Sequence, residues 1–248
     1  MQTANPVLSN KTFDGFMGFA SPDDTMTVGG TVNKTGVLLV CVLASAAWTW
    51  SRFSTANPAE VMPYLVGGGI IGLLLALITT FKMPWVPFTA PLYALAEGLV
   101  LGGLSAMLES RYPGIAVQAV AMTFGTLACM LLAYRAGVIR ATERFKLGVI
   151  AATGAIFLVY MVSWLLSLFG FDSFAFLNGN GLIGIGVSVV IVGVAALNLI
   201  LDFDLIESGA QRGAPKYMEW YGAFALMVTL IWLYIEILRL LSKLRSRN

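Results

Sequence analysis

Residues 181–202 read GLIGIGVSVVIVGVAALNLILD and decide the class of this protein, because no charged residue precedes Asp202 in the run. An α-helix rises about 1.5 Å per residue, so a run of this length can cross a hydrocarbon core of roughly 30 Å. The whole chain is 58% hydrophobic and only 11% charged, whereas a soluble domain carries about 25% charged residues. The sequence therefore predicts an integral membrane protein.

Similar apolar runs recur along the chain and predict an all-α membrane protein with seven transmembrane helices. Residues 1–34 are polar and Gly-rich and predict an N-terminal tail, with a single seven-helix domain over 35–248. The first span is short, and its start can lie before Thr35. The predicted spans are 36–50, 63–81, 91–108, 115–134, 147–169, 181–202 and 220–241.

The distribution of Lys and Arg predicts the orientation in the membrane. Basic residues are numerous in the tail and in the loops after spans two, four and six, whereas the opposite loops hold only Arg52 and Arg111. The positive-inside rule then places the N-terminus in the cytoplasm. Seven spans put the basic C-terminal stretch RLLSKLRSRN outside, so either the last span does not fully cross or the inner charges outweigh it. The inner basic residues are Lys11, Lys34, Lys82, Arg135, Arg140, Arg144, Lys146, Arg212 and Lys216.

Several chemistries are disfavoured by what the sequence lacks. There is no histidine, which removes Ser-His catalysis and His-based metal or haem sites. Cys41 and Cys129 are far apart and form no zinc or iron–sulfur pattern. The basic residues flank the spans, and no phosphate-binding glycine loop is present, so nucleic acid is not an expected partner. We expect neither an enzyme nor a bound cofactor.

The three carboxylates that end the sixth span differ in the direction they face. At 100° per residue, Asp202 shares one helix face with small and polar residues, which belong at helix contacts or water-lined cavities rather than against lipid. Asp202 is therefore predicted to face the bundle interior. Asp204 lies about 200° further round the helix, and we expect Asp204 and Glu207 to lie nearer the headgroups. The residues within about 40° of Asp202 are Gly184, Ser188, Ala195 and Asn198.

Glu97 lies near the middle of the third span, in PLYALAEGLVLGGLSAM. A carboxylate at mid-membrane costs several kcal/mol unless it is protonated, paired or hydrated, so it is a functional candidate. The alternative is a protonated side chain that bonds a neighbouring helix for structure alone. A stripe of small residues beside it predicts close helix packing. These residues are Ala94, Gly98, Gly102 and Ala106.

Glu236 lies on a face of the last span that also carries Gly222, Ala225 and Thr229. Arg239 follows three residues later, within ion-pair reach on a helix surface. Two interpretations stay open: a neutralised pair close to the interface, or a carboxylate that lines an ion path.

Taken together, PLYALAEGL, NLILDFDLIESG and EWYGAFALMVTLIWLYIEILRLL resemble the transmembrane Bax inhibitor motif family, in particular its bacterial Bax inhibitor-like branch. The resemblance extends to TMTVGGTVNKTGVLL and QAVAMTFGTLACMLLAYRAG, and so covers the chain from about residue 25. It implies a fold in which the last helix is central and the other six wrap round it. It also implies a pH-sensitive calcium leak in the bacterial inner membrane, regulated by one aspartate in helix six and another in helix seven. Members are associated with resistance to stress or cell death, and some bacterial members with restraint of a membrane protease.

Asp202 matches the family's helix-six aspartate, but Thr229 stands where the helix-seven aspartate is expected. Two carboxylates within about 4–6 Å repel each other, so such a pair responds to pH. Thr229 offers only a hydroxyl, which can still hydrogen-bond a carboxyl group on Asp202. Because Ca²⁺ favours 6–8 oxygen ligands, Asp202 is expected to be a weak calcium ligand. Asp202 titrating alone is favoured; Glu236 and Glu97 are the alternative partners.

These observations and the resemblance predict that the protein is a cation leak gated at Asp202, with calcium as the first candidate ion. The main rival is a non-transporting regulator that contacts a membrane protease or a stress-response partner through the tail or the charged helix ends. A proton-coupled transporter of a small solute is third, and depends on Glu97.

Overall fold

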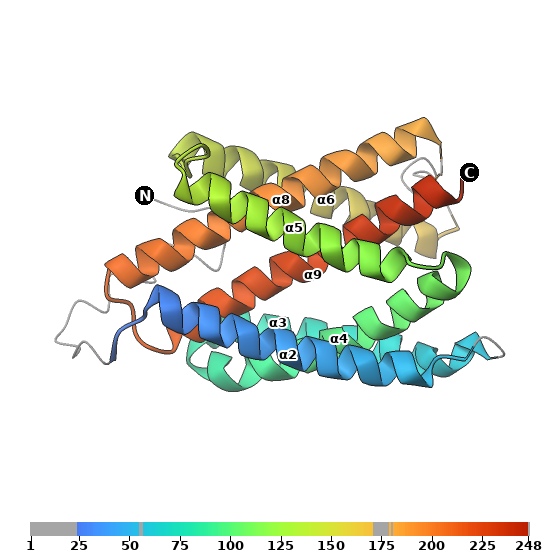
Figure 1. Ribbon diagram of the computed structural model, residues 1–248, viewed down its shortest axis with the longest axis horizontal. Coiled ribbons are helices and arrows are strands. Elements are labelled where there is room, and N and C mark those ends of the chain that lie inside the picture. Colours follow the sequence, from blue (N-terminus) through green and yellow to red (C-terminus); the bar gives the residue numbers. More distant parts are fainter. Residues whose placement is uncertain (1–23, 55–56, 171–178, 180, 248) are drawn as a thin grey trace.

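The computed structural model describes residues 24–54, 57–170, 179 and 181–247, and over that part of the chain the fold is a bundle of long helices (Figure 1). Seven of these helices are long and apolar enough to cross a membrane, which confirms the predicted all-α membrane fold. Short 3₁₀ turns at Pro58–Val61 and Met83–Trp85 precede the second and third of them. The seven are α2 (Val28–Arg52), α3 (Met62–Phe81), α4 (Val86–Arg111), α5 (Ile115–Arg135), α6 (Glu143–Leu168), α8 (Leu182–Gln211) and α9 (Met218–Arg245).

Helix α2 begins at Val28, inside the range that the sequence assigned to the tail. Thr27 caps the helix: its side chain accepts a hydrogen bond from the backbone N–H of Gly30 at 2.9 Å, which satisfies one of the free donors of the first turn. The first two turns of the helix contain polar residues, so hydropathy alone does not reveal them. Two of these residues, Thr31 and Thr35, are buried. Residues 1–23 of the predicted tail lie outside the described residues.

Helix α4 also begins earlier than its predicted span, at Val86 rather than residue 91. Pro87 lies in its first turn, where the missing N–H of proline costs nothing. Pro91 lies inside the helix and does not end it. The helix therefore starts more than one turn before the predicted span and runs through Pro91.

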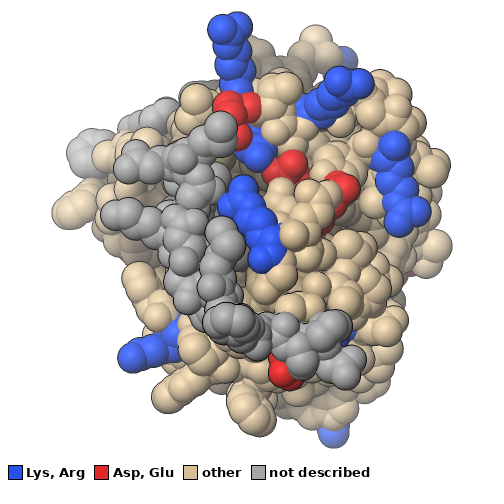
Figure 2. All heavy atoms as spheres, turned by 90° about the vertical axis from the view of Figure 1, so that its left-hand side faces the viewer, with Lys and Arg blue, Asp and Glu red and all other residues tan. Residues whose placement is uncertain are grey.

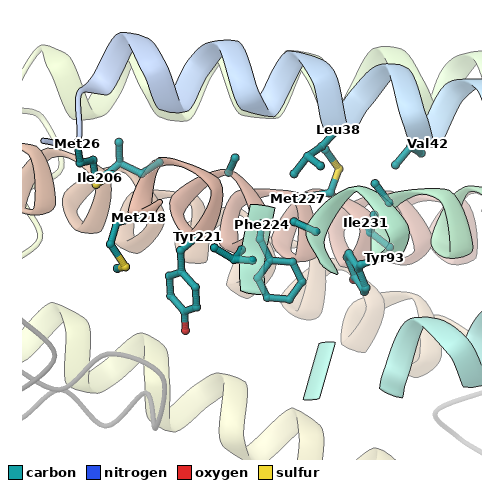
Figure 3. Close-up of a cluster of buried hydrophobic side chains, with 14 of the residues drawn as sticks. Met26, Leu38, Val42, Tyr93, Ile206, Met218, Tyr221, Phe224, Met227 and Ile231 are labelled. Carbon is teal, nitrogen blue, oxygen red and sulfur yellow. The ribbon is translucent and has the colours of Figure 1, made fainter. Parts of the chain in front are cut away.

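Helix α9 occupies the middle of the bundle, as the family resemblance implies (Figure 1). It is the most buried of the seven helices and packs against α2, α4, α5 and α8, whereas α3 packs mainly on α4 and α6 on α8. Two apolar clusters line it. One joins α9 to α2 and α4, and Figure 3 shows its Tyr93 and Phe224, whose rings lie 5.0 Å apart. The other joins α9 to α5 and α8 through Ile115, Leu199 and Leu233.

Close packing beside the small residues of α4 is confirmed. A Cβ added to Gly98 would collide with the Ser45 hydroxyl and with the Val42 carbonyl oxygen of α2. A Cβ added to Gly102 would collide with the backbone of Ala46, also on α2. The missing side chains therefore let α2 and α4 approach until their backbones nearly touch.

The bundle has two chemically different ends. Helix α2 begins and α9 ends at opposite ends of the bundle (Figure 1). Lys and Arg side chains gather at the end where α2 begins (Figure 2), where the α5–α6 and α8–α9 connections also lie. Helix α9 has 28 residues, about 42 Å of helix at 1.5 Å per residue. Its length favours a last helix that fully crosses the membrane.

Candidate functional site at the α8–α9 contact

Asp202 projects from α8 toward the central helix α9. Its carboxyl group interacts with the side chain of Thr229, the residue at the family's second aspartate position. One carboxylate oxygen, Oδ2, is buried and has no hydrogen-bond partner among the residues that the structure describes. The Thr229 hydroxyl also donates to the carbonyl oxygen of Ala225, one turn earlier, at 3.3 Å. The structure therefore brings together an interior carboxyl group and a hydroxyl group across two helices.

The other polar residue on that face, Asn198, turns to a different neighbour. Its side-chain amide donates to the Thr153 hydroxyl of α6 at 2.8 Å and to the Val194 carbonyl oxygen at 2.9 Å. Asn198 therefore links α6 to α8 one turn from Asp202. Both hydrogens of its side-chain amide are donated in these two hydrogen bonds.

Asp204 and Glu207 point away from the Asp202–Thr229 contact. Asp204 forms an ion pair with Lys146 of α6, with 2.6 Å between Oδ2 and Nζ. Glu207 accepts a hydrogen bond from the Tyr134 hydroxyl of α5 at 2.6 Å. Both carboxylates thus serve contacts near the end of the bundle.

Glu236 is an interior residue of α9, with only 2% of its surface exposed. Arg239 donates to it at 3.1 Å, and the Tyr160 hydroxyl of α6 donates to it at 3.2 Å. Seven residues separate it from Thr229, so it lies about 10 Å further along the helix. That spacing exceeds the 4–6 Å at which two carboxylates couple strongly, and the arrangement is a neutralised pair.

Glu97 projects from α4 toward α3. Gly72 of α3 makes room for it: a Cβ on that glycine would lie 2.6 Å from Glu97 Oε1. Tyr93, one turn earlier, interacts with it electrostatically. Among the described residues, no interaction joins Glu97 to Asp202.

Glu219, at the start of α9, is a buried carboxylate that the sequence analysis missed. It is fully buried, and it forms ion pairs with Lys34 of α2 and, at 3.1 Å, with Lys216. The backbone N–H and the hydroxyl of Thr27 donate to it at 2.9 and 2.8 Å. A signal for this ion pair was present in the sequence, because a Lys and a Glu each lie near the start of a helix. The predicted tail included Lys34, however, and so separated it from the helices.

Lys243, near the end of α9, is likewise buried rather than merely flanking the helix. Only 4% of its surface is exposed. Its ammonium group donates to the Ser188 hydroxyl at 2.9 Å and to the Gly184 carbonyl oxygen at 3.1 Å, both on α8. The small, polar face predicted for α8 thus receives a lysine at one end and presents Asp202 toward the other.

Asp202 and Thr229 bring one carboxyl group and one hydroxyl group to the contact. The described part of the chain holds no group of three or more Asp, Glu, Cys or His residues that could bind a metal together. Asp202 and Thr229 offer few oxygens, against the 6–8 that Ca²⁺ favours.

A comparison with known protein families places the chain beside one of them. The model of a protein family described as Bax inhibitor 1 like matches residues 5–246. Searches among curated proteins and among solved structures found no significant match.

Proposed function

We propose that this chain, which belongs to the Bax inhibitor 1 like family and is a multi-pass membrane protein, is a cation leak gated by protonation of Asp202, with calcium as the first candidate ion. The observation that carries the proposal is the contact between Asp202 and Thr229 across the α8–α9 interface, with one buried carboxylate oxygen left without a hydrogen-bond partner in the described structure. We place the protein in the bacterial inner membrane, with its N-terminus in the cytoplasm.

The two protonation states of Asp202 make different demands on this interface. A protonated carboxyl group can donate a hydrogen bond to the Thr229 hydroxyl, which keeps α8 against α9. An ionised carboxylate can only accept, and it needs partners for both oxygens, because a buried charge without them is costly. Water or a cation entering between the helices would supply those partners. Protonation thus biases the equilibrium between a closed and an open α8–α9 contact.

Because Thr229 replaces the second aspartate, the gate contains one titrating group rather than a coupled pair. A single carboxyl group titrates in one step, whereas a strongly coupled pair titrates in two separated steps, and a single carboxylate also holds Ca²⁺ less firmly. The proposed leak therefore has one pH transition and weak selectivity for calcium.

The test is calcium flux into dye-loaded proteoliposomes across pH 6 to 8. Native protein should conduct with a pH-dependent rate, and Asp202→Asn should abolish the pH dependence, because an amide does not titrate. Asp204→Asn is the matched control on the same helix, since Asp204 is paired with Lys146 outside the contact; it should keep the native profile. If correctly folded native protein conducts no cation at any pH, the leak is refuted in favour of a non-transporting regulator of a protease or stress response.

A further inference from the structure

Two neighbouring cavities lie between α2 and α5, apart from the Asp202 contact. The first, of about 930 Å³, lies toward the end of the bundle where α2 begins and is bounded by α2, α5, α8 and the α5–α6 connection. The second, of about 530 Å³, continues along α2 and α5 and is closed by α4 and α9. Leu39 lines both cavities, so they adjoin there. We call the two together the α2–α5 groove; Figure 1 shows α9 behind it, between the two helices.

The second cavity is suited to a hydrocarbon chain. None of its lining residues is charged, and Val42, Val120 and Leu230 are typical of them. The hydroxyl groups in its lining already have partners: Ser105 and Tyr234 share a hydrogen bond of 2.7 Å, and the Thr123 hydroxyl donates to the Ala119 carbonyl oxygen. An occupant of this half therefore gains from apolar contact and needs no hydrogen bonds.

The first cavity ends in two arginines, Arg135 and Arg140. Neither guanidinium group forms an ion pair or hydrogen bond with a group in the described part of the chain. The carboxylates that share the lining are already engaged: Asp204 with Lys146 and Glu207 with Tyr134. Guanidinium groups match phosphate oxygens in geometry and charge. This end of the groove therefore favours an anionic phosphate group.

We propose that the α2–α5 groove holds one anionic phospholipid, with its phosphate at Arg135 and Arg140 and an acyl chain running past Leu39 into the second cavity. The charge pattern carries the argument, because an occupant with one anionic end and one apolar end matches the groove along its length. Each cavity volume falls within the roughly 300–1,000 Å³ of pockets that enclose small molecules. A basic pocket between transmembrane helices is also a recognised setting for lipid headgroups.

The test uses delipidated, detergent-solubilised full-length protein and native mass spectrometry. Palmitoyl-oleoyl phosphatidylglycerol and the corresponding phosphatidylcholine are added separately, and bound lipid is counted per chain. Native protein should retain one phosphatidylglycerol and little phosphatidylcholine. Each cationic residue near the headgroup contributes on the order of fivefold in affinity, so the double variant Arg135→Gln, Arg140→Gln should bind phosphatidylglycerol roughly thirtyfold more weakly. Arg144→Gln, in the first turn of α6 and outside the lining, should bind like native protein.

A second pair of variants tests the acyl end. Ala47 lines the second cavity and Ala44 lines neither cavity, although both are exposed on α2. Ala47→Trp should reduce retention of phosphatidylglycerol, whereas Ala44→Trp should not. Equal retention of both lipids, or equal losses in the arginine variants and Arg144→Gln, would overturn the proposal. A lipid-free dimer would also overturn the proposal, since a second copy of the chain would then fill the groove. A monomer that retains no lipid would overturn it too.

Discussion

Glu219 at the start of α9 is fully buried against Lys34 of α2, although the two residues are far apart in the sequence. Beside this pair, backbone contacts join the residues before α2 to the α8–α9 connection. The backbone N–H of Met26 donates to the Ala214 carbonyl oxygen at 2.6 Å, and Thr25 and Pro215 form a β-bridge. Gly30 is required beside the carboxylate, because any Cβ there would collide with it. The central helix is thus anchored to the first helix at the basic end of the bundle.

Glu219→Ala should be strongly destabilising, because it leaves the Lys34 ammonium group and two Thr27 donors without their acceptor. Removing one partner of a buried ion pair costs about 3–5 kcal/mol, which corresponds to a fall of roughly 6–20 °C in Tm for a chain of this size. The measurement is thermal unfolding of the purified protein in detergent. Glu143→Ala is the control, because Glu143 is half exposed and lies 3.7 Å from Lys146; its Tm should change by less than about 2 °C.

A double-mutant cycle separates the ion pair from the carboxylate's other contacts. Lys34→Met combined with Glu219→Gln removes both charges and keeps similar volumes, and paired replacement of a buried ion pair is often close to neutral. The double variant should therefore be more stable than the sum of the single losses predicts, by 0.5–3 kcal/mol in magnitude. Strictly additive losses would show that Thr27 and Lys216, and not Lys34, account for the stability contributed by Glu219.

Thr229→Asp should convert the single carboxyl group at the α8–α9 contact into a coupled pair. Two carboxyl groups in contact titrate in two separated steps, so the pH dependence of calcium flux should gain a second transition between pH 6 and 8. Added carboxylate oxygens should also make the flux more sensitive to the calcium concentration. Thr229→Asn is the matched control: it is polar, nearly the same size as aspartate and does not titrate. An identical pH profile for the two variants would contradict a role for charge at this position.

The apolar periodicity of the sequence predicted the seven helices, and the small-residue face of the sixth span predicted that Asp202 points inward. What it missed were contacts made by polar residues close to helix ends. Lys34, Glu219 and Lys243 read as ordinary flanking charges, because hydropathy cannot distinguish a charge in water from one buried against a partner on another helix. The sequence allowed the first span to start before Thr35 but did not locate its first residue, since the first turn of α2 is stabilised by the Thr27 cap and by burial of Thr31 rather than by apolar residues.

Gly98→Ala should destabilise the α2–α4 packing that supports one side of α9. The added methyl group would collide with the Val42 carbonyl oxygen and the Ser45 hydroxyl, and overpacking of this kind costs about 1–3 kcal/mol. Gly125→Ala is the matched control on α5, because nothing lies within 4 Å of the Cβ it would add. That substitution should be neutral or stabilising by up to about 1 kcal/mol. Thermal unfolding of both variants gives the comparison, and equal Tm values would contradict the close helix approach.

Glu236→Gln and Glu97→Gln should both keep the pH profile of calcium flux that Asp202→Asn removes. Glu236 is held by Arg239 and Tyr160 about two turns beyond Thr229, and Glu97 faces Gly72 of α3. Neither carboxyl group is therefore close enough to share a proton with Asp202. The measurement is the same liposome flux across pH 6 to 8, with each variant normalised to its own maximum so that changes in folded yield cancel. If Glu236→Gln flattened the profile as Asp202→Asn does, the gate would extend along α9 to the Tyr160 contact. If Glu97→Gln instead abolished a saturable solute uptake, the carboxylate between α3 and α4 would belong to a transporter and not to a leak.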